Sequence, residues 1–254
     1  MSFLQQARQG AADRAKIVMV YGVPGIGKST VAAQMPNCVF VPTEDNVDHI
    51  TTATVLPLAK DYAMFKNMLV EIANEDHPFE NLVIDSISSL DKIINKAVEI
   101  DNNVDQIEKI PYGKGKEFAQ KYWDDFWSVI SYIRDNRNMN VILIAHPEIK
   151  KVPNPEGEAY DGYKPMLNEK AMEKLKQNCN AVFFANYKVM VRSVDAGFGN
   201  KEHKGVGNGS AVMYTQARPA HVAKSACNPP LPYEMPFDLA TAIDMMRYPS
   251  KYAS

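Results

Sequence analysis

Five short apolar runs constrain the fold of this chain more than any other feature. Each run holds four or five apolar residues between polar neighbours, which is typical of strands that are buried on both faces of a sheet. The runs occupy residues 16–22, 37–44, 81–86, 140–146 and 180–187. We therefore expect five central strands, most of them parallel.

Apolar residues recur with helical spacing between these runs. The three clearest stripes are Phe65, Met68, Leu69 and Ile72; Leu90, Ile93, Ile94, Ala97 and Val98; and Trp123, Phe126, Trp127, Ile130 and Ile133. We interpret all three stripes as core. Alternating strands and helices predict an α/β fold in which helices cover both faces of a mostly parallel sheet.

The pattern changes after Tyr187. Residues 187–195 and 210–216 are predicted strands around a glycine-rich segment, 196–209, which indicates a β-hairpin with a mobile tip. The last predicted helix covers residues 238–247. We expect one domain over residues 1–254, with an N-terminal extension at 1–15 and a hairpin and C-terminal extension at 187–237.

Charge and cysteine content narrow the functional class. The formal net charge is −2, so no overall basic field points to nucleic acid, and binding of that kind would need local patches. The three cysteines (Cys38, Cys179 and Cys227) form no CxxC pair, which favours a reducing cytoplasm over a zinc site or a disulfide framework. The polar N-terminus resembles no signal peptide, and no apolar run is long enough to predict a membrane span.

The stretch YGVPGIGKST at residues 21–30 matches G-x-x-x-x-G-K-[ST], between a predicted strand and a predicted helix. A phosphate chain needs several main-chain amides that point inward, and only a loop rich in glycine wraps that tightly. Lys28 is expected to reach the β- and γ-phosphates, and the Ser29 hydroxyl to bind Mg²⁺. The motif predicts an ATP site formed by Gly22, Val23, Pro24, Gly25, Ile26, Gly27, Lys28, Ser29 and Thr30.

A carboxylate that helps to hold Mg²⁺ usually follows a neighbouring strand. Asp85 ends the run at 81–86, and we expect it to serve the metal together with Ser29. The same aspartate stands where the next helix begins, so a helix N-cap is the alternative role.

Two further polar residues follow predicted strands. Glu44 is expected to orient or activate the attacking water, because parallel strands end at one crevice; Asp45 and a plain solvated loop are the alternatives. His146 ends the run at 140–146 and is a candidate sensor of the γ-phosphate by hydrogen bonding. A cap on the loop before Pro147 explains His146 equally well.

The order of these segments is similar to the RecA-like ATPase core. It more narrowly resembles bacteriophage nucleotide-binding proteins that act as RecA-like single-strand annealing factors. The resemblance rests on residues 16–45, on NLVIDSISSLD at 81–91, on PYGKGKEF at 111–118, on VILIAHPEIKK at 141–151 and on NAVFFAN at 180–186. It implies that Lys28, Ser29 and Asp85 hold Mg-ATP and that Glu44 is the catalytic acid or base.

The resemblance also implies self-association into a ring or filament, with a basic finger that reaches the neighbouring subunit's nucleotide. The family pattern is an alanine–lysine pair followed by arginine. In VAKSACNPP, Lys224 matches and the arginine is missing, so Arg218 is a possible substitute.

In the RecA-like core, single-stranded DNA is held by loops that follow the third and fourth strands. Residues 101–117 and 147–168 occupy these places, and both carry lysines that would meet phosphates and tyrosines that would stack on bases. These residues are Lys109, Lys114, Lys116 and Tyr112 in the first segment, and Lys150, Lys151, Lys164, Tyr160 and Tyr163 in the second. Interleaved acids dilute both patches, so plain solvated loops are the alternative.

Two other functions stay open. A non-catalytic ATP-dependent switch would recruit a replication or defence partner without the need for turnover. A small-molecule kinase would use residues 110–121 as a lid, although this segment offers lysines where such lids carry arginine.

Overall fold

The computed structural model describes residues 13–155, 157–195 and 201–252. Most of the predicted N-terminal extension and the tip of the predicted hairpin, residues 196–200, lie outside the described residues.

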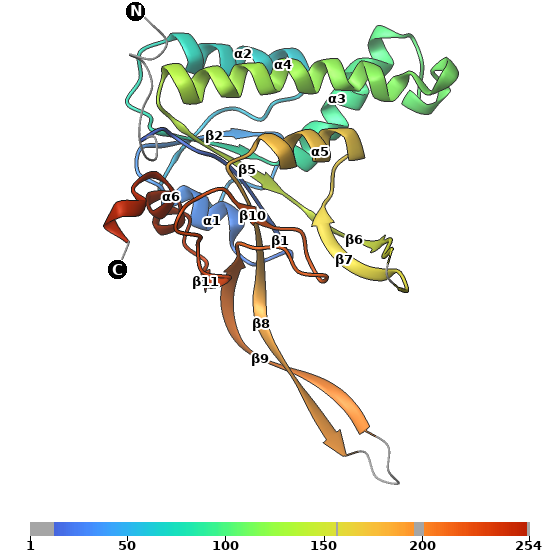
Figure 1. Cartoon of the computed structure of the whole chain (residues 1–254). Coiled ribbons are helices and arrows are strands. Elements are labelled where there is room, and N and C mark those ends of the chain that lie inside the picture. Colours follow the sequence, from blue (N-terminus) through green and yellow to red (C-terminus); the bar gives the residue numbers. More distant parts are fainter. Residues whose placement is uncertain (1–12, 156, 196–200, 253–254) are drawn as a thin grey trace, which may run out of the picture.

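The five predicted strands form the centre of one mixed sheet (Figure 1). They are β1 (Ile17–Gly22), β2 (Cys38–Pro42), β4 (Asn81–Asp85), β5 (Asn140–Ala145) and β8 (Ala181–Asp195). They pair in parallel in the order β8-β1-β5-β4-β2. Four short or peripheral strands extend the sheet: β3 (Thr54–Val55), β9 (Lys201–Tyr214), β10 (Lys224–Ser225) and β11 (Glu234–Pro236). The predicted α/β fold with a mostly parallel central sheet is confirmed.

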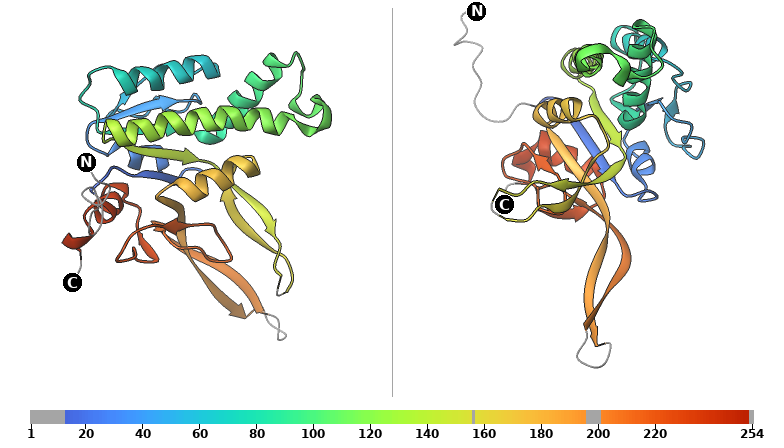
Figure 2. Two further views of the ribbon diagram at one scale, coloured as in Figure 1. Left: turned by 45° about the horizontal axis from the view of Figure 1, so that its top comes forward. Right: turned by 90° about the vertical axis from the view of Figure 1, so that its right-hand side faces the viewer.

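Helices cover both faces of the sheet (Figures 1 and 2). One face packs against α2 (Tyr62–Asn74), α3 (Ile87–Asp101), α4 (Gly115–Asn136) and α5 (Glu169–Asn178). The opposite face packs against α1 (Lys28–Ala33) and α6 (Leu239–Arg247). Three single turns of 3-10 helix lie at Ile107–Lys109, Pro111–Gly113 and Pro249–Lys251. No helix in the described part of the chain is both long and apolar enough to cross a membrane.

Two hairpins correct the sequence-based boundaries. The strands predicted at 180–187 and 187–195 are the single strand β8, which pairs with β9 across a bulge next to Tyr187. Most of the predicted glycine-rich loop therefore belongs to β9, because a glycine amide still pairs across a ladder; Gly205 lies opposite Val191. Figures 1 and 2 show β8 and β9 projecting from the body of the molecule as an arm.

The second hairpin lies in the segment that was predicted as a loop at 147–168. Strands β6 (Pro147–Val152) and β7 (Tyr160–Pro165) pair in antiparallel register from Pro147–Pro165 to Val152–Tyr160. Its strands carry charged residues in place of an apolar run, which is why the sequence pattern gave no strand signal.

Asparagines hold the amino ends of the central strands. Asn140 donates to Asn81 Oδ1 at 2.9 Å and accepts from the Lys16 amide at 2.9 Å. Asn180 accepts from the Ile17 amide at 2.8 Å. These side chains satisfy main-chain groups where the ladders begin, so they align the starts of four strands.

We predict that Asn140→Ala lowers the free energy of unfolding by about 2 kcal/mol, because two partly buried groups lose their partner. Urea denaturation followed by tryptophan fluorescence measures this change. Asn136→Ala is the matched control, since Asn136 is exposed and bonds only within its own helix; a change below about 0.5 kcal/mol is expected there. Equal losses in both variants would contradict the assigned role of Asn140.

Candidate functional site

The candidate site lies at the carboxyl edge of the parallel strands. Tyr21 of β1 pairs with Ala145 of β5, and Asp85 of β4 pairs with Pro42 of β2. The residues that follow each strand therefore emerge side by side, as expected for ligand sites in open parallel sheets.

The loop from Gly22 to Thr30 has the backbone of a phosphate cradle. Gly25 and Gly27 have φ values of 75° and 91°, a region that disfavours other residues, and a Cβ at either position would meet nothing within 4 Å. A Cβ at Gly22 would lie 2.1 Å from the Ala185 carbonyl oxygen, so β1 and β8 approach closely where the loop begins.

Main-chain amides of this loop are available to a ligand. Among the described residues, the amides of Gly25, Gly27, Lys28 and Ser29 donate to no protein acceptor. Open space beside two of these glycines and a row of unused donors fit the oxygens of a triphosphate.

Lys28 is almost buried, with 9% of its surface exposed, and points back at the loop. Its Nζ donates to the carbonyl oxygens of Gly22 at 2.8 Å and Val23 at 3.2 Å. Burial lowers the pKa of Lys28, while the charges of Asp85 and Glu44 oppose that shift. The ammonium group is therefore held by two carbonyl oxygens of the loop, which phosphate oxygens can replace as its partners.

Ser29 and Asp85 form a close pair. The Ser29 hydroxyl donates to Asp85 Oδ2 at 2.5 Å, and the Asp85–Ser86 peptide bond is cis. Burial raises the pKa of Asp85, and the hydrogen bond from Ser29 partly offsets this. The alternative that Asp85 caps the next helix is wrong, because the N-cap of α3 is Ser86, whose side chain accepts from the Ser89 amide.

Hydroxyl and carboxylate oxygens are the donors that Mg²⁺ prefers, so Ser29 and Asp85 fit this ion. The described residues contain no group of three His, Cys, Asp or Glu side chains placed to bind a metal. An ion at this pair would take its remaining ligands from phosphate oxygens and water.

Glu44 stands beside this pair and is held by three donors. Its Oε2 accepts from Ser89 Oγ at 2.7 Å and Ser86 Oγ at 3.1 Å, and lies 2.9 Å from His146 Nε2. The neighbouring Asp45 is exposed. The structure thus joins Glu44 and His146, two residues singled out separately from the sequence, in one polar network.

The network changes the proton affinity of Glu44. Burial opposes ionisation, but hydrogen bonds from His146, Ser89 and Ser86, together with the charge of His146, outweigh it and lower the pKa to about 2. Because such a carboxylate holds its proton weakly, it suits the orientation of a water molecule better than removal of a proton in an early step.

The basic finger residues lie away from this site within one chain. Lys224 sits in β10, pairs across from Val182 and donates from Nζ to the Gln177 carbonyl at 3.0 Å. The Arg218 guanidinium stacks over the Tyr233 ring at 4.5 Å. A role for Lys224 or Arg218 in a neighbouring subunit stays a prediction.

Sequence reasoning missed several residues at the site. Thr43 Oγ1 accepts from the Ser86 amide at 2.9 Å, which fixes the strand end that carries Glu44. Tyr187 donates from its hydroxyl to the Gly25 carbonyl at 3.1 Å and so links β8 to the phosphate loop. Ser86 and Ser89, which donate to Glu44, were missed as well. Their available signal was the stretch DSISSL, because three hydroxyls directly after a strand place hydrogen-bond donors at the edge of the site.

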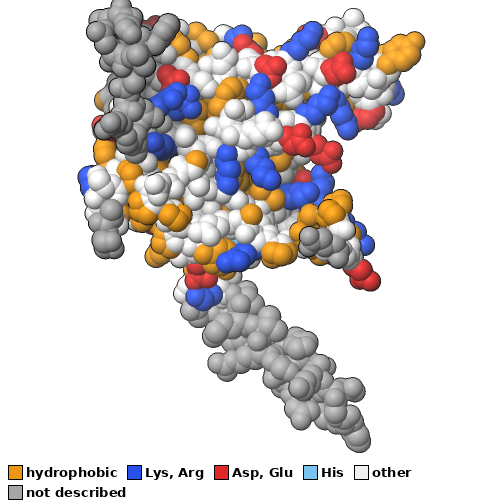
Figure 3. Space-filling model, viewed as in Figure 1, with side chains coloured by type: hydrophobic (Ala, Val, Ile, Leu, Met, Phe, Trp, Pro, Cys, Tyr) orange, Lys and Arg blue, Asp and Glu red, His pale blue; other side chains and the backbone are white. Residues whose placement is uncertain are grey.

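The tyrosines proposed to stack on DNA bases differ in how far they are exposed to solvent. Tyr112 is 95% exposed, whereas Tyr163 packs on Phe184 with ring centroids 4.9 Å apart. One face of the half-buried Tyr163 ring is thus covered by Phe184, and its stacking on a base stays a prediction. Figure 3 shows lysine and arginine side chains interspersed with acidic ones over α4 and α5, in agreement with the near-zero net charge.

Fold and site together define a P-loop nucleotide-binding protein built on a mostly parallel α/β sheet. The chain belongs to the AAA domain family, because the family model AAA_24, described as an AAA domain, matches residues 14–227. Among solved structures, the chain is similar to one entitled "Crystal structure of the RadB recombinase", at 14% identity and a TM-score of 0.44, over 85% of this chain and 92% of that one. A comparison with curated proteins finds no match.

The low pKa of Glu44 predicts a stability difference that depends on pH. The pKa falls from an ordinary value of 4.5 to about 2 on folding, so the stabilisation is complete above pH 4.5 and disappears as the pH falls towards 2. Relative to Glu44→Gln, the wild type should be more stable by about 1–3 kcal/mol near neutral pH, and this gap should close in acid.

Urea denaturation of both proteins at a series of pH values tests this, over the range in which each unfolds cooperatively. A gap that is independent of pH would show that the Glu44 carboxylate is not stabilised in its charged form.

Proposed function

We propose that this protein binds Mg-ATP in the loop Gly22–Thr30 and hydrolyses it while acting on single-stranded DNA in recombination or annealing. The observation that carries the proposal is the convergence of three features at one sheet edge. These are a loop with open amides, a hydroxyl–carboxylate pair (Ser29 and Asp85) and an ionised carboxylate, Glu44, held by hydrogen-bond donors.

Each residue has a defined task in this proposal. The loop amides and Lys28 bind the phosphate oxygens and stabilise the charge that develops during transfer. Mg²⁺ held by Ser29 and Asp85 neutralises phosphate charge when bound. Glu44 orients the attacking water, and His146 positions the Glu44 carboxylate through the 2.9 Å contact.

A second candidate, a non-catalytic ATP-dependent switch, is favoured by one specific observation. Glu44 Oε2 already has three polar partners, Ser86, Ser89 and His146, which leaves the other carboxylate oxygen, Oε1, to orient a water molecule. A slow or absent hydrolytic step is consistent with this reduced capacity.

Support for a nucleic acid partner comes from the position of the β6–β7 hairpin. Pro147, its first residue, directly follows His146, and the Met166 amide after the hairpin donates to the His146 carbonyl at 2.8 Å. The hairpin that carries Lys150 and Lys151 therefore begins and ends next to His146, a member of the Glu44 network. The resemblance to bacteriophage annealing factors supports single-stranded DNA as the substrate, self-association into a ring or filament, and Lys224 or Arg218 as the finger that acts in trans.

We predict that Lys28→Ala weakens ATP binding at least about tenfold, because it removes the buried ammonium group that would bind the phosphate oxygens together with the loop amides. Glu44→Gln should keep ATP binding within about threefold and slow hydrolysis by about a hundredfold or more, since it removes water orientation and spares the cradle. Calorimetry and phosphate release measure the two quantities. Lys170→Ala, an exposed lysine on α5, is the control and should match the wild type in both.

Normal ATP binding by Lys28→Ala would remove the site assignment. Unchanged turnover in Glu44→Gln, with binding intact, would remove only the catalytic role of Glu44.

Single-stranded DNA should raise the ATPase rate, and the double variant Lys150→Ala with Lys151→Ala should reduce this stimulation at least about threefold, through loss of phosphate contacts. Phosphate release with and without an oligonucleotide at moderate salt measures the effect. The basal rate should be unchanged, because both lysines lie outside the nucleotide site. ATP binding without any DNA-dependent change in rate would favour the switch.

A further inference from the structure

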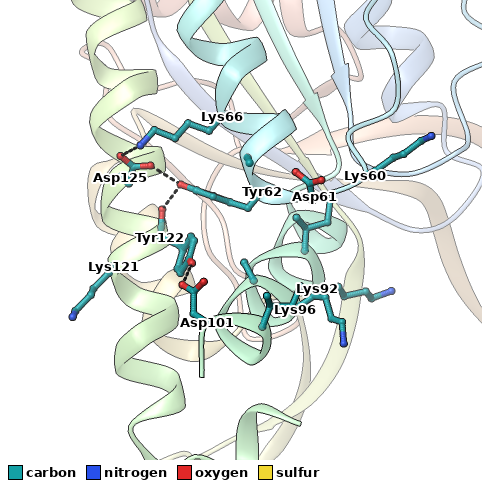
Figure 4. Close-up of a pocket in the computed structure, with 14 residues that line it drawn as sticks. Lys60, Asp61, Tyr62, Lys66, Lys92, Lys96, Asp101, Lys121, Tyr122 and Asp125 are labelled. Atoms are coloured by element: carbon teal, nitrogen blue, oxygen red, sulfur yellow. Dashed lines mark hydrogen bonds and ion pairs between the residues drawn. The ribbon is translucent and has the colours of Figure 1, made fainter. Parts of the chain in front are cut away.

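A groove lies in the helical layer, between α2, α3 and α4, and encloses a cavity of about 770 Å³ (Figure 4). None of its lining residues belongs to the phosphate loop or to the Glu44 network. Its lining comprises Lys60, Asp61, Tyr62, Ala63, Lys66, Lys92, Ile93, Lys96, Ala97, Ile100, Asp101, Lys121, Tyr122 and Asp125.

The floor of the groove is apolar. Ile93 and Ala97 belong to the α3 stripe that the sequence predicts as core, yet both are only half-buried, and Ile100 is 64% exposed. The rings of Tyr62 and Tyr122 complete the floor and meet edge to face, with centroids 4.6 Å apart. One side of α3 is thus left without a partner in the described chain.

The carboxylates of the groove are engaged by the protein. Asp125 accepts from the Tyr62 hydroxyl at 2.8 Å and pairs with Lys66 at 2.9 Å. Asp101 accepts from the Tyr122 hydroxyl. These contacts hold the tyrosine rings in place and leave their acids little capacity to pair with the other lysines.

Three lysines at the rim have no acidic partner. Lys60, Lys92 and Lys121 form no ion pair with any described residue, and Figure 4 shows Lys121 on one side of the groove and Lys60 and Lys92 on the other. The third groove acid, Asp61, caps α2 by accepting from the Met64 amide at 2.8 Å. An apolar floor is therefore flanked on both sides by lysines that have no acidic partner; the Lys121 ammonium lies over the Phe118 ring, 5.5 Å from its centroid.

We propose that this groove binds an acidic amphipathic helix of a partner protein. The apolar face of such a helix would cover Ile93, Ala97 and Ile100, and acidic side chains on its flanks would meet Lys60, Lys92 and Lys121. Nucleic acid fits less well, because the two tyrosines pack against each other and their hydroxyls are bonded, so they offer no open pair of faces for stacked bases.

The test uses the full chain without nucleotide, so its outcome does not depend on the ATPase proposal. The probe is a fluorescein-labelled helical peptide with leucines along one face and glutamates on both flanks. Fluorescence anisotropy should give at least about tenfold tighter binding for this peptide than for a version with lysines in place of the glutamates.

Two variants probe the two halves of the groove. Lys92→Glu with Lys121→Glu reverses the rim, and Ile100→Asp places a charge on the floor; each should weaken peptide binding about tenfold or more. Lys170→Glu with Lys176→Glu on α5 is the control, with the same change in net charge at exposed positions outside the groove, and should bind as the wild type does. Thermal melting confirms that every variant is folded.

Several outcomes would overturn the proposal. These are equal binding of the charge-inverted peptide, wild-type binding by the rim variant, or no peptide binding together with oligo-dT binding that the rim variant loses. Self-association in sedimentation that Ile100→Asp abolishes, without peptide binding, would assign the groove to a second copy of this chain.

Discussion

The parallel pairing of β1, β5, β4 and β2 is the constraint on which the proposed site depends. Their register brings the ends of strands that are far apart in sequence to one edge, so that Glu44 after β2 and His146 after β5 lie 2.9 Å apart across 102 positions. A slip of one residue in β4 would turn Asp85 to the other face of the sheet. The asparagines at the opposite edge hold this register in place.

Two carboxylates at this edge occupy opposite electrostatic environments. Asp85 is deeply buried, and burial raises its pKa, so a metal ion that neutralises its charge would relieve an existing cost. Glu44 is surrounded by donors that lower its pKa to about 2 and keep it charged. Environments that push the pKa values of two acids apart commonly give the acids different roles, which supports the proposed roles of Asp85 as metal ligand and Glu44 as water orienter.

Two projecting hairpins also contact this edge of the sheet. Tyr187 at the base of the β8–β9 arm touches the phosphate loop, and the β6–β7 hairpin begins directly after His146. Both projections are thus connected to residues that would respond to a bound nucleotide. The lysine-rimmed groove lies on the helical layer, and it is connected to the same edge through α3, whose N-cap Ser86 and first-turn Ser89 donate to Glu44.

Local patterns in the sequence determined the five central strands, the phosphate loop and the roles that Asp85 and Glu44 can have, because burial periodicity and the positive φ of Gly25 and Gly27 are requirements within a short window. Only the tertiary structure decided that Ser86, Ser89 and His146 converge on Glu44, that the half-buried Tyr163 stacks on Phe184, and that Ile93 and Ala97 line a groove. Those facts depend on strand order and on which helix packs beside which, and such contacts between distant residues leave no periodic trace in the chain.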